Sequence, residues 1–410
     1  MKRVHNPKDA SFSGYQKFAI ALLAIIQFTV VLDFMVLSPL GAILLQELSI
    51  TTEQFGHVVS AYAFSAGISA FLAAGFADRF DRKRMLLFFY GGFIVGTLFC
   101  GLAPNYETLL IARTLTGFFG GVMSSIGFAI VTDLFPLEKR GRVLGFVQMA
   151  FSASQIFGLP IGLLLATHFD WHMPFLAIVA LSLVVIVLII CFMRPINAHL
   201  EQPQMRNPFR KLGKALANRR YLQGFATVTL LSSGGYMLMP FASAFAVGNL
   251  KIELDSLPLM YMVAGACTLV TGPIAGRLAD SLGRLQVFLI GSTLAMVFIL
   301  IFTHLGPTPL WLVIALNAFL YIGVSTRMIA AQTLLTAVPA PADRGTCMSV
   351  NSSIQQAAGG FAAIIAGLVV AQSPDGTLER YGTLGYIVSG IIIATALLVL
   401  NINRVVRQGY

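Results

Sequence analysis

Twelve apolar stretches, each long enough to cross a lipid bilayer as a helix, follow one another along the whole chain. A helix needs about 20 apolar residues to cross the hydrocarbon core. Charged residues make up only 11% of the 410 positions, against about 25% in soluble domains, so a soluble fold is excluded. We therefore expect an all-α membrane protein with transmembrane helices over 17–44, 54–77, 85–103, 107–131, 142–166, 172–193, 221–247, 257–279, 285–304, 309–337, 346–371 and 383–402.

The positive charges are distributed unevenly between the two sides of these predicted helices. Nearly all of the 27 Lys and Arg residues fall in segments on the side of the amino terminus. Lys251 and Arg380 fall on the other side, and two more cations lie within spans. Because cations gather on the cytoplasmic side of membrane proteins, we predict a multi-pass protein of the bacterial inner membrane with both termini in the cytoplasm. This distribution accounts for the net charge of +10 without a nucleic-acid partner.

Two loops of the first half recur in the second half at almost the same spacing. The loop around Asp78 returns around Asp280, 202 positions later, and the loop around Arg140 returns around Arg344, 204 positions later. In transporters built from such repeats, the solute site lies between the halves near the middle of the membrane. We expect two pseudo-symmetric halves of six helices over 1–193 and 221–410, joined by a cytoplasmic linker over 194–220.

The recurring loop carries a recognisable pattern. Its second copy reads Gly276-Arg277-Leu278-Ala279-Asp280-Ser281-Leu282-Gly283-Arg284. The chain resembles the major facilitator superfamily, and more narrowly its twelve-helix drug/proton antiporter branch, which also includes sugar exporters. That family's signature is close to G-x-L-A-D-R-x-G-R-[KR]. The first copy departs from it, with Ala74 and Asp81 where glycines are usual, but Asp tolerates a left-handed turn, so we expect the turn to be preserved.

The resemblance implies that this loop is a latch between the halves on the cytoplasmic side. Asp78 would face the start of the eleventh span, whose helix amino terminus carries partial positive charge, and Arg82 would pair with Asp133. Asp280 and Arg284 are the latch residues of the second half. The alternative is that the cations of the loop only set the topology.

The fourth span carries a second family pattern. Its residues fit R-x-x-x-G-x-x-x-G, which the family associates with proton coupling, at Arg113, Gly117 and Gly121. The two glycines share one face and permit close helix packing. An arginine inside the membrane costs at least about 2.5–3.5 kcal/mol unless it meets water or an acid, so Arg113 needs a partner.

The fifth span carries Gly158, Pro160 and Gly162, which are similar to the G-P-x-x-G-G signature of the antiporter branch. Proline removes a backbone donor and bends a helix. The flanking glycines allow another helix to approach the bend. A span that is merely kinked would show the same residues.

Asp33 stands inside the first span among apolar residues. An ionised acid is costly in that setting, so burial favours its protonated form, and such an acid can load and release a proton. It is our candidate proton carrier, together with Arg113. The alternative is a permanent structural ion pair between the two, which would hold the acid ionised.

Arg327 lies near the middle of the tenth span, where the repeat would place Asn317 opposite Arg113. It could contact the solute, provide the counter-charge for Asp33, or extend to the membrane surface. Amide and phenol groups on the cavity-lining spans suit sugar-like or zwitterionic solutes as well as drugs, although each is also a common helix-packing residue. These candidates are Gln148, Gln155, Tyr236, Asn317, Tyr321, Gln332, Asn351 and Gln355.

Together these features predict a proton-coupled exporter, an antiporter of small drugs, sugars or metabolites that works by alternating access. A symporter or uniporter of the same fold, or a flippase for amphiphilic lipids, is the alternative. Nothing in the pattern of histidines, cysteines or paired acids indicates an enzyme, a metal site or a cofactor. We expect a monomer, because the two halves already supply both sides of a path.

Overall fold

The computed structural model describes residues 12–76, 80–197, 200, 213, 216–336, 338–339 and 344–408. Within these ranges, twelve helices are long and apolar enough to cross a membrane. The spans of the first half are α1 (Gly14–Val36) with α2 (Gly41–Glu47), α3 (Thr52–Phe76), α4 (Arg82–Cys100), α5 (Tyr106–Gly120) with α6 (Met123–Leu134), α7 (Leu137–Ala153) with the π-helical turn η3 (Ser154–Gly158) and α8 (Leu159–His168), and α9 (Met173–Phe192).

The second half repeats this order. Its spans are α11 (Arg219–Leu238) with the 3₁₀ turn η5 (Met239–Phe241) and α12 (Ala242–Gly248), α13 (Leu257–Ser281), α14 (Arg284–Thr303), α15 (Leu310–Leu335), α16 (Arg344–Val369) and α17 (Tyr381–Gln408). A 3₁₀ turn, η6 (Leu254–Ser256), precedes α13, and a short antiparallel hairpin of β1 (Ala371–Gln372) and β2 (Leu378–Glu379) precedes α17.

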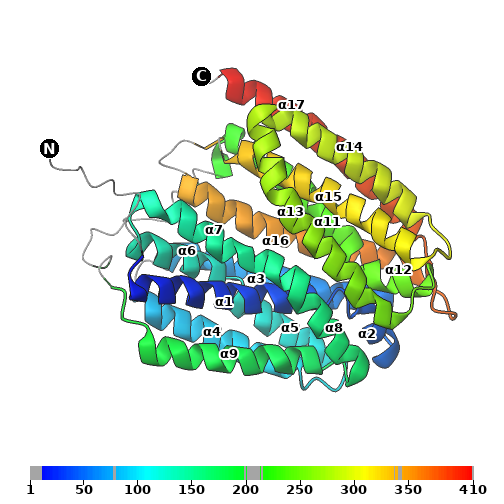
Figure 1. Cartoon of the computed structure of the whole chain (residues 1–410), viewed down its shortest axis with the longest axis horizontal. Coiled ribbons are helices and arrows are strands. Elements are labelled where there is room, and N and C mark those ends of the chain that lie inside the picture. The colour runs from blue at the N-terminus through cyan, green and yellow to red at the C-terminus, as the bar shows by residue number, and fades with distance from the viewer. Residues whose placement is uncertain are drawn as a thin grey trace.

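The two halves use the same packing scheme. In the first half α1 packs on α7 and α9, and α5 packs on α3 and α4; in the second half α11 packs on α16 and α17, and α15 packs on α13 and α14. Figure 1 shows the first half as the blue-to-green layer and the second half as the green-to-red layer. The predicted fold class, two pseudo-symmetric halves of six helices, is therefore confirmed. The limits of the 194–220 linker stay a prediction, because most of that segment lies outside the described residues.

The first residues of α1 and the last residues of α17 lie at the same end of the molecule (Figure 1). We call this end the inner end and the opposite one the outer end. The halves meet through two equivalent pairs of spans, α3 with α16 and α13 with the η3–α8 region, and through α2 with α12. The boundary between the halves therefore runs between these elements.

Spans one and seven are both interrupted before they reach the outer end. Span one turns over 37–40 between α1 and α2, and span seven passes through η5, which contains Pro240. Proline has no N–H to continue the helical hydrogen bonds. The short outer pieces then meet across the boundary between the halves, where Ser243 donates a hydrogen bond to the Ser38 carbonyl at 2.8 Å.

Candidate functional site

Asp33 and Arg113 form an ion pair inside the first half. Arg113 Nη1 lies 2.9 Å from Asp33 Oδ2 and 3.2 Å from the Asp33 carbonyl oxygen. Neither side chain is exposed by more than 1%. The packing of α5 against α3 and α4, and of α1 beside them, brings together two residues that are 80 positions apart in the sequence. Of the two partners considered for Asp33, the structure pairs it with Arg113.

Two side chains that the sequence did not single out complete this pair. Thr97 on α4 donates a hydrogen bond to Asp33 Oδ1 at 3.3 Å. The guanidinium of Arg113 lies over the ring of Tyr62 on α3, 4.5 Å from its centroid, in a cation–π contact. Arg113 Nε has no hydrogen-bond partner in the described part of the chain. Nothing in the sequence distinguishes Thr97 or Tyr62 from their neighbours.

The pair lies next to the boundary between the halves. Phe34, which follows Asp33, packs against Tyr62 with ring centroids 5.3 Å apart. The Phe34 ring also packs against Tyr236 of the second half, with ring centroids 5.8 Å apart. Tyr236, a predicted cavity residue, thus contacts the first half one residue away from Asp33.

The fifth span changes its helical form where the sequence predicted a bend. The π-helical turn η3 ends immediately before α8, in which Pro160 occupies the first turn. A Cβ at Gly158 would come within 2.6 Å of Leu32, and one at Gly162 within 3.0 Å of Val36, so both glycines let α1 approach closely. Single π-turns often mark functional positions in helices.

Gln155 in this π-turn contacts the second half. Thr268 on α13 donates a hydrogen bond to Gln155 Oε1 at 3.1 Å. Gly265, one turn before Thr268, lies against the backbone at Gln155, where a Cβ would come within 3.0 Å. Gln155 is therefore a contact between the halves in this conformation.

Arg327 is buried inside the second half, with 2% of its surface exposed. Its guanidinium lies 6.0 Å from the centroid of the Phe288 ring on α14. Arg327 Nε and Nη2 have no hydrogen-bond partner in the described ranges. The structure does not bring it to Asp33, which is bound to Arg113.

The other predicted cavity residues are spread over the two halves. Asn317 is buried and its Nδ2 has no partner among the described residues, and Tyr321 and Gln355 are half-buried. Gln148 and Gln332 are exposed. Their exposure thus ranges from buried to exposed, and their role in a solute cavity stays a prediction.

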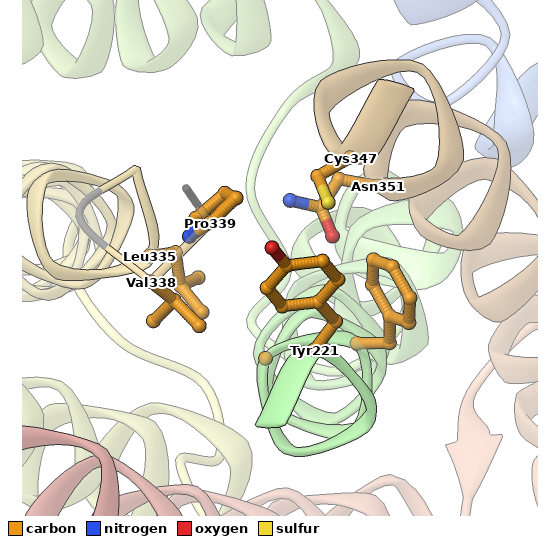
Figure 2. Close-up of a pocket in the computed structure, with 8 residues that line it drawn as sticks. Tyr221, Leu335, Val338, Pro339, Cys347 and Asn351 are labelled. Carbon is orange, nitrogen blue, oxygen red and sulfur yellow. The ribbon is translucent and has the colours of Figure 1, made fainter. Parts of the chain in front are cut away.

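Asn351 lines a small cleft near the inner end of α11, α15 and α16, with about 210 Å³ of space that is partly open to the surroundings. Figure 2 shows Leu335, Val338 and Pro339 on one side of it, with Tyr221, Cys347 and Asn351 on the other. The Oδ1 atom of Asn351 is buried without a hydrogen-bond partner in the described part of the chain. Apart from Asn351 and Tyr221, the lining is mostly apolar, which makes this cleft a poor match for a polar solute.

At the inner end of the first half, Arg82 Nε donates to Asp133 Oδ2 at 2.9 Å, which joins the start of α4 to the end of α6. This pair is the one that the sequence predicted. Asp280 and Arg284 are exposed, and neither forms a hydrogen bond or ion pair in the ranges that the structure covers. Asp78 lies outside the described residues.

The sequence profile of the Major Facilitator Superfamily matches residues 23–245 and 225–408, which together cover nearly the whole chain. The chain belongs to the Major Facilitator Superfamily. It is therefore a secondary transporter that carries small-molecule solutes across a membrane, and not an enzyme. The family resemblance that we drew from the loop and span signatures is confirmed.

Three comparisons place the chain within this superfamily. It is 27% identical to the uncharacterized MFS-type transporter YceJ of Bacillus subtilis (strain 168), over 66% of this chain and 68% of that protein. It is 24% identical to a protein of Helicobacter pylori (strain G27) named "Probable sugar efflux transporter", over 78% of this chain and 81% of that protein. The crystal structure of the nucleoside transporter NupG shares the fold with a TM-score of 0.76, at 15% identity over 94% of this chain and 99% of that chain.

The first copy of the superfamily loop signature departs from the pattern at Asp81, and the structure shows what this residue does instead. At the position where the second copy has Gly283, with φ of +100°, the first copy has Asp81 with φ of −56°. Our expectation that Asp81 would keep the left-handed turn is wrong. Its carboxylate instead accepts hydrogen bonds from Arg84 N and Ile196 N, both at 2.9 Å. Asp81 thus caps α4 and binds the segment that follows α9.

The glycines of the superfamily signature in span four have a packing role. A Cβ at Gly117 would overlap the backbone of Tyr62, and one at Gly121 would overlap the backbone of Ala66. Both contacts hold α5 against α3. The position of Tyr62 under the Arg113 guanidinium therefore depends on this close approach.

Proposed function

We propose that this transporter is a proton-coupled antiporter that exports small solutes by alternating access, with Asp33 as the proton carrier. The observation that carries this proposal is the buried Asp33–Arg113 pair beside the boundary between the halves. Two opposing effects act on this acid: burial disfavours its charged form and the adjacent guanidinium favours it, so a change at the guanidinium can load or release a proton.

The surroundings of the pair connect its protonation to the arrangement of the halves. When Asp33 takes a proton, Arg113 loses its counter-charge and keeps its contact with the Tyr62 ring. Phe34 touches that same ring and also Tyr236 of the opposite half. A shift of Arg113 is therefore transmitted to a contact between the halves through one aromatic ring.

The contacts at the outer end support export as the direction of transport. With both termini in the cytoplasm, the hydrogen bonds between Ser243 and Ser38 and between Thr52 and Val370 close the outer side. A closed outer side fits the state in which an exporter loads its solute from the cytoplasm. The similarity to a protein named as a sugar efflux transporter supports export of small polar solutes. We place the protein in the bacterial inner membrane as a monomer.

The test uses purified protein in proteoliposomes that contain a pH-sensitive dye. A proton gradient is set in either direction and a panel of sugars and dyes is added to wild type, Asp33→Asn and the control Asp170→Asn, which changes an acid in an exposed outer loop. We expect solute-evoked proton flux in wild type and in the control, and none in Asp33→Asn.

Other outcomes would identify the alternatives. Solute exchange without proton flux in wild type would indicate a uniporter, and proton movement in the same direction as the solute would indicate a symporter. Movement of labelled lipid between the leaflets, without flux of any soluble compound, would indicate a flippase. Each of these results would contradict antiport.

A further inference from the structure

Arg327 differs from the other buried cations that the structure describes, because none of the described acids lies beside it. Arg113 pairs with Asp33, and Arg82 pairs with Asp133. Arg327 is at least as deeply buried as Arg82, yet its Nε and Nη2 atoms have no partner in the described residues. A buried guanidinium without a counter-charge is strongly unfavourable, so an anion from outside the chain would satisfy it.

The sequence offers no internal acid for this role. No Asp or Glu occurs between Arg219 and Asn249, between Leu257 and Ala279, between Arg284 and Ala342, or between Arg344 and Pro374. These ranges contain the membrane-spanning parts of spans seven to eleven. Asp33 is the acid placed inside a span of the first half, and it is already bound to Arg113.

The repeat relates Asp33 to a position in span seven that adjoins a neighbour of Arg327, although the repeat partner of Arg113 is Asn317. Asp33 lies in span one, and the repeat interval of 202 positions leads from it to Gly235 in span seven. The neighbouring Gly234 is the residue that approaches the cation, with its ideal Cβ position 3.8 Å from Arg327 Nη1. The first half thus has an acid where the second half has a pair of glycines beside an arginine.

Because it is a glycine, Gly234 places no side chain of α11 against the guanidinium. Gly235 is exposed, and a Cβ there would meet nothing within 4 Å. The backbone of Arg327 is fixed by α14, where Gly291 lies against its nitrogen. A guanidinium presents a planar fork of N–H donors that matches the two oxygens of a carboxylate or phosphate.

We propose that Arg327 binds the anionic group, a carboxylate or phosphate, of the transported solute beside Gly234 and Gly235. The inference rests on the proposed transport function, and it narrows the solutes to those that carry an oxyanion. Extension of Arg327 to the membrane surface does not account for the geometry. Its Cα is eight residues, or about 12 Å, from the end of α15, and its side chain lies between helices.

The first experiment measures the unfolding temperature of the purified full chain with small oxyanions and their neutral counterparts. The probes are acetate against acetamide, benzoate against benzamide, and inorganic phosphate, at constant ionic strength. A ligand that binds only the folded protein raises its unfolding temperature. We expect a rise of a few degrees with the anions in wild type and no rise in Arg327→Gln. Equal shifts in both proteins, or no shift in wild type, would overturn the proposal.

A second variant keeps the test informative if Arg327→Gln does not fold. Gly234→Asp places a carboxylate beside the guanidinium, and the atoms around its Cβ position are at ordinary van der Waals distances of 3.5 Å or more. We expect Gly234→Asp to fold and to lose the response to anions. Gly234→Asn, which has the same volume without the charge, is expected to keep more of it. If both variants respond as wild type does, the site is elsewhere.

Lipid headgroups and the solute are distinguished by reconstitution. Wild type and Arg327→Gln are placed in nanodiscs of phosphatidylcholine, with or without phosphatidylglycerol. We expect the soluble anions to stabilise wild type in both. Stabilisation that needs phosphatidylglycerol and Arg327, without any response to soluble anions, would assign the oxyanion to a lipid and overturn the solute assignment.

The proton-flux assay separates this inference from the proposed function. If the anion response depends on Arg327 while Asp33→Asn leaves proton flux unchanged, antiport through Asp33 fails and the anion site stands. If Asp33→Asn abolishes solute-evoked proton flux while no anion affects wild type, the anion site alone fails.

Discussion

Gly56 lies so close to Ala363 of the opposite half that a Cβ on the glycine would be 2.8 Å from the Ala363 carbonyl oxygen. This contact joins α3 to α16 near the outer end, where Thr52 also donates a hydrogen bond to the Val370 carbonyl at 2.6 Å. No side chain fits between the two backbones. The closed outer side therefore requires glycine at this position.

We predict that Gly56→Leu opens the outer side. Forcing extra atoms into a packed contact costs about 1–3 kcal/mol, and about 1.4 kcal/mol changes a population ratio tenfold. In a chain without native cysteines, Ala42→Cys is a suitable reporter because Ala42 is buried in the nearby outer contact of α2 with α12, where its N–H donates to Ser243 Oγ at 3.3 Å. Its labelling from outside should be at least about fivefold faster with Gly56→Leu, which corresponds to the lower end of that range. Gly390→Leu, on an exposed face with open space around it, is the control. Unchanged labelling in Gly56→Leu would contradict the predicted role of this contact.

The Arg82–Asp133 pair should contribute to the balance between the inward-open and outward-open conformations of the transporter. Its two side chains are 6% and 17% exposed, and a hydrogen bond between charged groups contributes about 1.5–3 kcal/mol. We expect Arg82→Ala and Asp133→Asn to change the labelling of both mouths of the protein by single cysteines, whereas Lys83→Ala, which alters a neighbouring cation, should not. If all three variants label as wild type does, the pair only sets topology or holds α4 to α6.

The Asp33–Arg113 pair predicts a strongly non-additive pair of substitutions. Arg113→Leu alone leaves a buried acid without its cation and should lower stability by roughly 3–5 kcal/mol. The double variant Asp33→Leu/Arg113→Leu removes both charges and should unfold at a clearly higher temperature than Arg113→Leu. Thermal unfolding of the purified proteins measures this directly. A double variant less stable than either single one would mean that the two side chains do not act as a pair.

Asp81 should hold the beginning of the linker. Asp81→Ala removes the acceptor for Arg84 N and Ile196 N, and the loss of a helix cap costs about 1 kcal/mol. We expect trypsin to cleave the segment 194–220 several-fold faster in this variant. Asp81→Ser keeps a cap for α4 but has one oxygen, so it should retain stability and still increase cleavage. Asp280→Ala changes an exposed acid and serves as the control. Equal cleavage rates in all of them would contradict the contact.

Hydropathy predicted the spans, because a helix that crosses lipid must be long and apolar. The recurring loop sequences predicted the two halves. The breaks in spans one and seven were not predicted, although Pro39 and Pro240 stand at them, because a proline inside an apolar stretch does not tell a kinked span from an interrupted one. Sequence placed Asp33 and Arg113 in their spans and left the partner open. Which cation pairs with Asp33 depends on how α1, α4 and α5 pack. Thr97 and Tyr62 become part of the site only through that packing.

The failed expectation at Asp81 has a physical cause outside its own loop. A local pattern predicts the backbone from the residue type alone, and aspartate is compatible with a left-handed turn. Instead of a left-handed turn, the loop forms hydrogen bonds with Ile196. The Asp81 carboxylate accepts from Ile196 N, and Arg82 N donates to the Ile196 carbonyl at 3.1 Å. A contact with a segment more than one hundred positions away decides the conformation of this residue.

The same contact makes the order of the two halves in the polypeptide matter. The linker occurs once, after the first half, and it is bound by a residue that the second half replaces with Gly283. A permuted gene that encoded the second half first would place the linker beside a loop that has Gly283 in place of the carboxylate of Asp81. The halves are thus related by shape but are not interchangeable as building blocks, and a chimaera that exchanges loops between them would have to carry Asp81 along with its linker.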